Sequence, residues 1–220
     1  MNLLFVDLFS PEGAPYEPST LEGSALGGTE ATALRVATGL SEHHRVWFAQ
    51  KSRQERVHYG EGLEFLSYSE VLGSSFPDMD AIIVLKRPRG MDELRIRFPS
   101  ASLFLWLHDY LDVYPFRILR RYRRTLLRNK AQIIAVSRTH ARATASLFNE
   151  KLPIPVFRKL GWAQSLRVGY VYNPIPDDLM PDGTKPDLCS LIFFSSPNKG
   201  LEQVMELFFL AKKHLPLLKF

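Results

Sequence analysis

Short apolar segments alternate with amphipathic segments through the first 175 residues of the chain. Apolar runs of strand length predict strands at residues 3–8, 45–50, 63–66, 81–85, 102–107, 133–136 and 167–172. Apolar residues at helical spacing predict helices at residues 29–40, 91–97, 116–128 and 139–148. This alternation is typical of an α/β fold, in which helices flank a Rossmann-like parallel sheet.

A segment dense in proline, aspartate and glycine follows this pattern. It reads PIPDDLMPDGTKPD and predicts a linker at residues 176–187, between a first domain at residues 1–175 and a second that starts at residue 188. Beyond it we expect a strand at 188–195, a helix at 200–214 and the opening of a strand at 217–220. Because these elements cannot bury their own apolar faces, residues 188–220 predict the start of a truncated second Rossmann-like domain.

The composition adds bounds on class and compartment. Hydrophobic residues make up 45% and charged residues 23% of the chain, as in ordinary globular proteins. The single cysteine, Cys189, excludes an internal disulfide, and no apolar run has the length of a membrane span or signal peptide. These features predict a cytoplasmic protein, with peripheral contact at the inner face of the membrane left open. The net charge of +5 does not choose between anionic partners.

Two adjacent glycines, Gly27 and Gly28, precede the first long helix in the loop SALGGTEAT. Glycine allows close backbone approach, and the free N–H groups of a helix start attract anions, so this loop is a candidate diphosphate site. We expect Thr29 to be the N-cap of the helix. The alternative is a simple turn, since Glu30 already complements the helix dipole and no G-x-G-x-x-G spacing is present.

Polar residues follow two of the predicted central strands. His108 and Asp109 come directly after the strand at 102–107, and Lys86 and Arg87 follow the strand at 81–85. Ligands of open α/β sheets lie outside the carboxyl ends of the strands, so these side chains are expected to border a cleft. His108 could contact a sugar hydroxyl or act in acid–base chemistry, or it could simply cap a strand end. Lys86 and Arg87 could meet an anionic acceptor or be solvated.

A second anion site is indicated by FFSSPNKGLEQV, where Lys199 and Gly200 precede a predicted helix. A lysine beside a helix start supplies a cation in addition to the helix dipole. An ordinary helix start with an exposed lysine is the alternative.

Taken in order, these motifs resemble the retaining glycosyltransferases of GT-B fold, family 4 (glycosyl transferases group 1). The similar segments are LGGTEATALRVATGL, LWLHDY, IIAVSRTHARAT, VGYVYNPI and SLIFFSSPNKGLEQVMELFFLAKKHLPLLKF. The resemblance implies a GT-B N-terminal, acceptor-side domain followed by the start of the donor-side domain. It implies transfer of a sugar from a nucleotide-diphosphate sugar, with retention and without a metal or other cofactor, to a polysaccharide, lipopolysaccharide or other glycoconjugate.

The resemblance also assigns roles to residues. It implies that Gly27, Gly28, Lys199 and Gly200 bind the donor phosphates, and that His108 is the catalytic residue that touches the transferred sugar. The chain departs from the family where many members carry an arginine shortly before the lysine, because Ser195, Ser196 and Asn198 stand there. The E-x7-E motif and the base pocket of the family have no counterpart in these 220 residues.

Two alternatives to a glycosyltransferase follow. The first is a non-catalytic Rossmann-like module that binds an acceptor or a partner chain. The second is another nucleotide-binding enzyme such as an epimerase, against which the missing G-x-G-x-x-G argues.

A run of arginines carries much of the positive charge. RILRRYRRTLLRNK lies in a stretch from residue 113 to 149 without any acidic residue, and its helical spacing predicts that Phe116, Leu119, Leu126 and Leu127 face the core. The opposite face is a solvated surface, or it contacts anionic lipid headgroups or a phosphate-bearing lipid acceptor. Nucleic acid is not expected, because no reading motif is present. The arginines of this face are Arg117, Arg120, Arg121, Arg124 and Arg128.

Overall fold

The structure is a computed structural model that describes residues 1–9, 15–23, 26–152, 164–175, 183, 185, 187–193 and 200–220. It divides into two compact units, Met1–Pro174 and Ile175–Phe220. Among the described residues, no helix has the length and apolar character needed to cross a bilayer.

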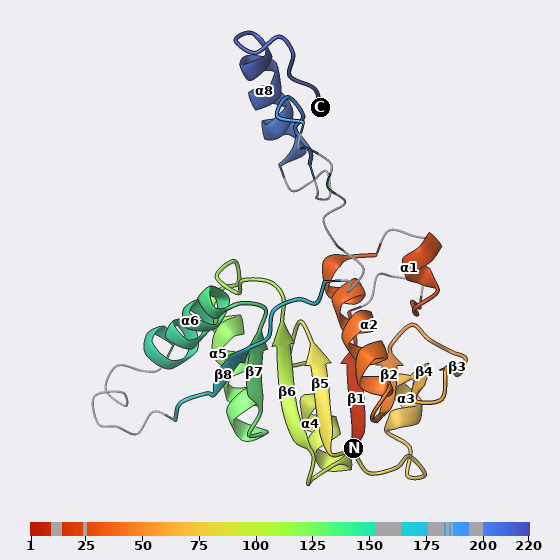
Figure 1. The fold of residues 1–220 in the computed structure, drawn as a ribbon. Coiled ribbons are helices and arrows are strands. Elements are labelled where there is room, and N and C mark those ends of the chain that lie inside the picture. Colours follow the sequence, from red (N-terminus) through yellow and green to blue (C-terminus); the bar gives the residue numbers. More distant parts are fainter. Residues whose placement is uncertain are drawn as a thin grey trace. The chain divides into compact units, whose positions relative to one another are not determined.

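The first unit is built on an eight-stranded sheet with the order β3-β4-β2-β1-β5-β6-β7-β8 (Figure 1). All neighbouring strands are parallel except β3 and β4, which form an antiparallel pair at one edge. This arrangement confirms the predicted α/β class with a mostly parallel sheet. The strands are β1 (Asn2–Asp7), β2 (Arg45–Gln50), β3 (Val57–Tyr59), β4 (Leu63–Ser67), β5 (Ala81–Leu85), β6 (Ser102–Leu107), β7 (Gln132–Ala135) and β8 (Val168–Tyr170).

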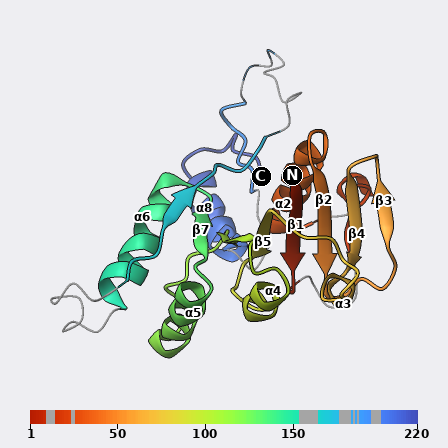
Figure 2. The ribbon, with the colours of Figure 1, turned by 90° about the horizontal axis from the view of Figure 1, so that it is seen from below.

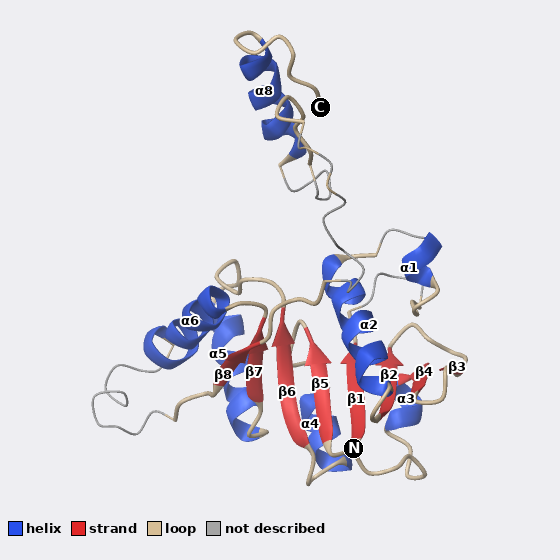
Figure 3. Cartoon of the chain, in the orientation of Figure 1, coloured by secondary structure: helices blue, strands red, loops and turns tan. Residues whose placement is uncertain are grey.

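Helices cover both faces of this sheet. Figure 2 shows α2 on one face and α3, α4 and α5 on the other, and Figure 3 separates these helices from the strands by colour. A π-helical turn, Leu147–Lys151, follows α6 directly. The helices of the first unit are α1 (Thr20–Gly23), α2 (Gly28–Ser41), α3 (Tyr68–Val71), α4 (Met91–Arg97), α5 (Phe116–Arg128) and α6 (Arg138–Ser146).

The core has two layers, because successive strand residues point to opposite faces. Leu4 and Val6 of β1 join the cluster that includes Leu94 of α4, whereas Leu3 and Phe5 join the cluster with residues of α2. Burial on both faces explains why the strands read as continuous apolar runs rather than alternating ones.

The sheet reverses its direction of growth at β1. From β1 the chain adds β2 and β4 on one side, then crosses back and adds β5 to β8 on the other side. The neighbours β1 and β5 therefore flank a topological switch point, whose carboxyl side is the usual ligand position in such sheets.

Several local predictions were wrong. Thr29 is not the N-cap of α2: the helix already begins at Gly28, and Gly27 is the N-cap without a side-chain hydrogen bond. Phe116 does not face the core but is 56% exposed, because it lies one turn before the exposed Arg120, on the same side of α5. In the predicted strand at 188–195, residues 187–193 contain only an isolated bridge, from Ser190 to Lys219, and residues 194–199 lie outside the described part.

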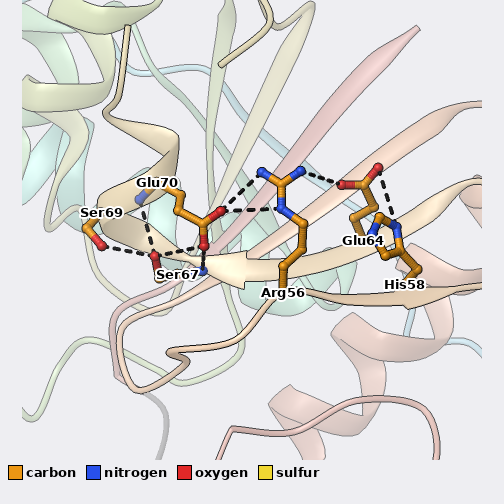
Figure 4. A network of polar contacts seen from close by, with 6 residues as sticks. All are labelled: Arg56, His58, Glu64, Ser67, Ser69 and Glu70. Atoms are coloured by element: carbon orange, nitrogen blue, oxygen red, sulfur yellow. Dashed lines mark hydrogen bonds and ion pairs between the residues drawn. The ribbon is translucent and has the colours of Figure 1, made fainter. Parts of the chain in front are cut away.

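A polar network ties the β3–β4 hairpin to α3 (Figure 4). The Arg56 guanidinium donates to Glu64 of β4 at 3.4 Å and to Glu70 of α3 at 3.1 Å. Glu70 also completes a capping box with Ser67. Each of these groups has a partner within the network, and the side chains of Arg56 and Glu70 are 44% and 37% exposed, so we interpret it as a structural link at the sheet edge.

The second unit contains α8 (Leu201–Lys212). Phe208 of this helix is buried and lies 5.5 Å from the ring of Phe220, measured between ring centroids. Leu207, Phe209 and Leu210 remain more than half exposed. The unit therefore leaves a substantial part of its apolar surface uncovered.

Candidate functional site

Four ionisable side chains gather at the carboxyl edge of the sheet, next to the switch point. Glu30 stands in the first turn of α2, Lys86 follows β5, His108 follows β6, and His140 stands in the first turn of α6, which follows β7. The charges of Glu30, Lys86 and His140 all act on His108, as does that of Asp109. The structure thus brings together Lys86, His108 and Asp109, as the sequence predicted, and adds Glu30 and His140.

Glu30 and Lys86 form an ion pair between α2 and the end of β5. The Lys86 ammonium donates to Glu30 Oε1, and the side chains are only 21% and 7% exposed for Lys86 and Glu30. The Lys86 backbone has a φ of +66°, and its N–H donates to the Trp106 carbonyl at 2.9 Å. A lysine adopts this left-handed conformation only at a cost of about 1–3 kcal/mol, so its neighbours must hold it there.

The glycine pair meets this ion pair at the start of α2. A Cβ atom added to Gly27 would collide with the Glu30 carboxylate, whereas the space around Gly28 is open. Glycine at position 27 therefore lets Glu30 fold back over the positive end of the helix dipole. A donor phosphate placed at Gly27 would meet a carboxylate of the same charge, while Gly28 leaves room for a ligand.

His108 has a neutral imidazole with a free nitrogen. Its ring lies 4.8 Å from the ring of Trp106, between centroids, and its buried Nε2 has no hydrogen-bond partner among the described residues. Burial lowers the pKa of His108 to about 4; the Asp109 charge opposes this shift and the Lys86 charge adds to it. At neutral pH the ring can therefore donate one hydrogen bond and accept another, which suits a hydroxyl group.

His140 is a site residue that the sequence interpretation missed. Its side chain is buried, at 2% residue exposure, and its ring lies 4.7 Å from that of Tyr110, between centroids. Neither ring nitrogen has a partner of normal geometry in the described chain, although the Asp109 backbone lies near enough to oppose the lowering of its pKa by burial. The sequence did contain a sign of this position, because SRTH directly follows the predicted strand at 133–136. In the structure the Ser137 side chain caps α6 and His140 stands in its first turn.

Arg87 connects loops around the site through its guanidinium group. Its guanidinium donates to the Tyr114 hydroxyl at 2.8 Å and lies over the Phe9 ring at 4.7 Å from the centroid. These contacts join the loops that follow β1, β5 and β6, so Arg87 positions the rim of the site. Asp109, by contrast, is exposed beside His108.

The second predicted anion site is only partly described. Lys199 lies outside the described residues. Gly200 is the N-cap of α8, with a φ of +102° that favours glycine. Its role in phosphate binding stays a prediction.

A hollow of about 450 Å³ lies at the opposite end of the sheet. Its lining includes Leu126, Lys130, Gln132 and Arg167, which stand at or before the amino ends of β7 and β8. Ligand sites of parallel sheets lie at the carboxyl ends, so we assign this hollow no role in binding.

No protein-family model matches the chain, and no match was found among curated proteins or among solved structures. The fold and the site are those of an α/β domain with a histidine-containing polar cluster at the carboxyl edge of its sheet.

The lowered pKa of His108 predicts a pH-dependent stability. Between pH 6.5, the usual value for histidine, and about 4, the unfolded chain binds a proton at this residue and the folded chain does not. The free energy of unfolding therefore decreases as the pH falls from 6.5 towards 4, by roughly 2 kcal/mol after allowance for partial exposure. Above pH 6.5 this effect is absent, because His108 is neutral in both the folded and the unfolded chain. We expect His108→Gln to remove this part of the pH dependence in urea unfolding at pH 7.5 and 4.5.

The matched control is His43→Gln, because His43 is an exposed histidine in the turn between α2 and β2; its unfolding free energy should depend on pH as that of the wild type does. If lowering the pH reduces the unfolding free energy of His108→Gln as much as that of the wild type, the pKa of His108 is not lowered in the folded chain.

Proposed function

We propose that the chain is the acceptor-side domain, with the start of the donor-side domain, of a retaining GT-B glycosyltransferase of family 4. The observation that carries the proposal is the neutral His108 with its unpartnered Nε2, at the carboxyl end of β6 beside the switch point. The ordered resemblance of five segments to that family supports it.

The proposed role of His108 is to bind a hydroxyl of the transferred sugar. A neutral, half-buried imidazole whose Nε2 has no partner among the described residues can bind such a group without the competition of a fixed partner. It is not suited to act as an imidazolium acid at neutral pH, because its pKa is about 4. The Glu30–Lys86 pair keeps the adjoining surface close to electrically neutral, which suits an uncharged sugar better than a phosphate.

We assign binding of the donor phosphates to the second unit. In this proposal Lys199 neutralises the leaving diphosphate, Gly200 stands beside it at the helix start, and no metal is required. The exposed Leu207, Phe209 and Leu210 of α8 are typical of a helix that packs against further structure, which agrees with a larger donor-side domain. The acceptor is a polysaccharide, lipopolysaccharide or other glycoconjugate.

A second candidate is a non-catalytic module that binds an acceptor or a partner. It is favoured by one observation: the carboxylate of Glu30 already fills the anion position at the start of α2.

Two experiments separate these candidates. The gene sequence after the Phe220 codon should continue in frame into a second Rossmann-like domain with an E-x7-E pair; an immediate stop codon would favour the binding module. Calorimetry of the chain with UDP, GDP and their sugars should show heat of binding. The absence of heat with every donor would also place the binding module ahead for these 220 residues.

A further inference from the structure

The arginines of α5 divide into two groups in the structure. Arg123 donates to the carbonyl of Phe148 at 2.9 Å and also to that of Gln164, and Arg128 pairs with Asp92 of α4. These two side chains stabilise the packing of α5. The remaining arginines are exposed and have no ion-pair or hydrogen-bond partner among the described residues: Arg117, Arg120, Arg121 and Arg124.

These four arginines share the solvent face of the helix. At about 100° per residue they fall within roughly one third of the circumference, opposite the buried Leu119 and Leu126. No acidic residue occurs between residues 113 and 149 to neutralise them within the helix. The face, which we call the α5 basic face, therefore carries an uncompensated charge of +4.

Apolar side chains are exposed at the amino-terminal end of the same helix. Val113 is 79% and Phe116 56% exposed, and Ile118 is also exposed. On the helical wheel Phe116 and Ile118 stand on either side of the arginines. A purely solvated helix surface does not require exposed large apolar residues beside its cations.

A surface of this composition fits an anionic membrane. Arginines bind lipid phosphates, while flanking aromatic and aliphatic side chains enter the boundary between headgroups and acyl chains. A nucleic acid would also attract the arginines but offers no place for Val113, Phe116 and Ile118. We propose that the α5 basic face docks the protein on an anionic lipid bilayer, with Phe116 and Val113 inserted among the headgroups.

The position of this surface bears on the acceptor. The segment that carries Val113 and Phe116 continues directly from β6 and His108, so the apolar end of α5 lies at the carboxyl edge of the sheet. Docking there brings the histidine site to the membrane surface. This part rests on the proposed function, and it specifies a lipid-linked acceptor for the sugar.

The test is co-sedimentation with two kinds of vesicle. One contains phosphatidylcholine alone, and the other contains phosphatidylcholine with roughly 30 mol% phosphatidylglycerol, which resembles an anionic membrane leaflet. The wild-type chain should bind the anionic vesicles at least about 10-fold more strongly than the neutral ones, and less at high salt. The exposed Leu207 and Phe209 of α8 contribute equally to both vesicles, so the difference between the vesicles is the readout.

The variants separate charge from apolar insertion. Arg120→Gln/Arg124→Gln should lower anionic binding about 10-fold or more, because each basic residue contributes about a factor of five at such a surface. Phe116→Ser should weaken binding to both vesicles. The matched control is Arg35→Gln/Lys51→Gln, which removes two exposed charges outside α5 and should bind like the wild type.

Three results would overturn the proposal: equal wild-type binding to both vesicles, an unchanged Arg120→Gln/Arg124→Gln variant that is folded by circular dichroism, or binding to duplex DNA or RNA in place of vesicles. Failure of the proposed function is distinguishable, because it appears as absent sugar transfer with vesicle binding intact.

Discussion

Replacing His108 with alanine is expected to lower the rate of sugar transfer roughly 100-fold in the protein expressed from its complete gene. The reason is that the free Nε2 is the group we assign to the transferred sugar, and its hydrogen bond would be lost at the transition state. Initial rates with a nucleotide-diphosphate sugar and a membrane extract as acceptor measure the effect.

Folding must be separated from chemistry in this experiment. His108 packs beside Trp106, so thermal unfolding of the His108→Ala variant belongs with the rates. His58→Ala is the control, since His58 lies on the edge strand β3. A folded His108→Ala variant with wild-type turnover would remove His108 from the site.

Breaking the Glu30–Lys86 pair is expected to have the largest effect on stability. We expect Glu30→Gln to lower the unfolding free energy by about 2–3 kcal/mol, because it leaves the Lys86 ammonium unpaired beside the positive end of the α2 dipole. Lys86→Met should lower the unfolding free energy by less, because Glu30 still interacts favourably with the positive end of the α2 dipole. Urea unfolding at pH 7.5 measures both variants.

The double variant isolates the interaction. Glu30→Gln/Lys86→Met should be less destabilised than the sum of the two single variants, since neither charge is then left alone. Lys86→Met should also raise the pKa of His108, because the Lys86 charge now lowers it. Additive costs, with an unmoved His108 titration in NMR spectra, would show that the two side chains do not interact in solution.

Much of the fold was predictable because most strands are apolar runs bounded by charged or turn residues. The bounds of β2, β5, β6, α4 and α5 were predicted correctly from such runs and from helical spacing. β3 was missed because its three residues include the exposed Tyr59 and His58, and only pairing with β4 makes them a strand. α3 was missed although its capping box, Ser67 with Glu70, is visible in the sequence.

The site was predictable only where it follows the strand ends. The positions of Lys86, His108 and Asp109 come from that rule. The pairing of Lys86 with Glu30 joins residues 56 positions apart, and no local pattern reports it. The same holds for Arg87, whose guanidinium is engaged by Phe9 and Tyr114 through loops from three strands.

The geometry also changes the role expected of the glycine pair. Gly27 makes room for the Glu30 carboxylate, and only Gly28 borders open space. In our proposal the acceptor-side domain offers a neutral, hydroxyl-binding surface, while cations for the donor phosphates come from the second unit. This division of tasks is part of the central claim of our proposal, that the chain belongs to a retaining glycosyltransferase.

Its most direct test is sugar transfer by the protein expressed from its complete gene. Labelled UDP-, GDP-, ADP- and dTDP-sugars are incubated with anionic vesicles and lipid extract as acceptor, and the anomeric configuration of the product is determined by NMR. We predict transfer from one donor class, with retention, into the lipid fraction, and without inhibition by a chelator. A folded protein that transfers no sugar from any of these donors, or that inverts the anomeric centre, would contradict the proposal.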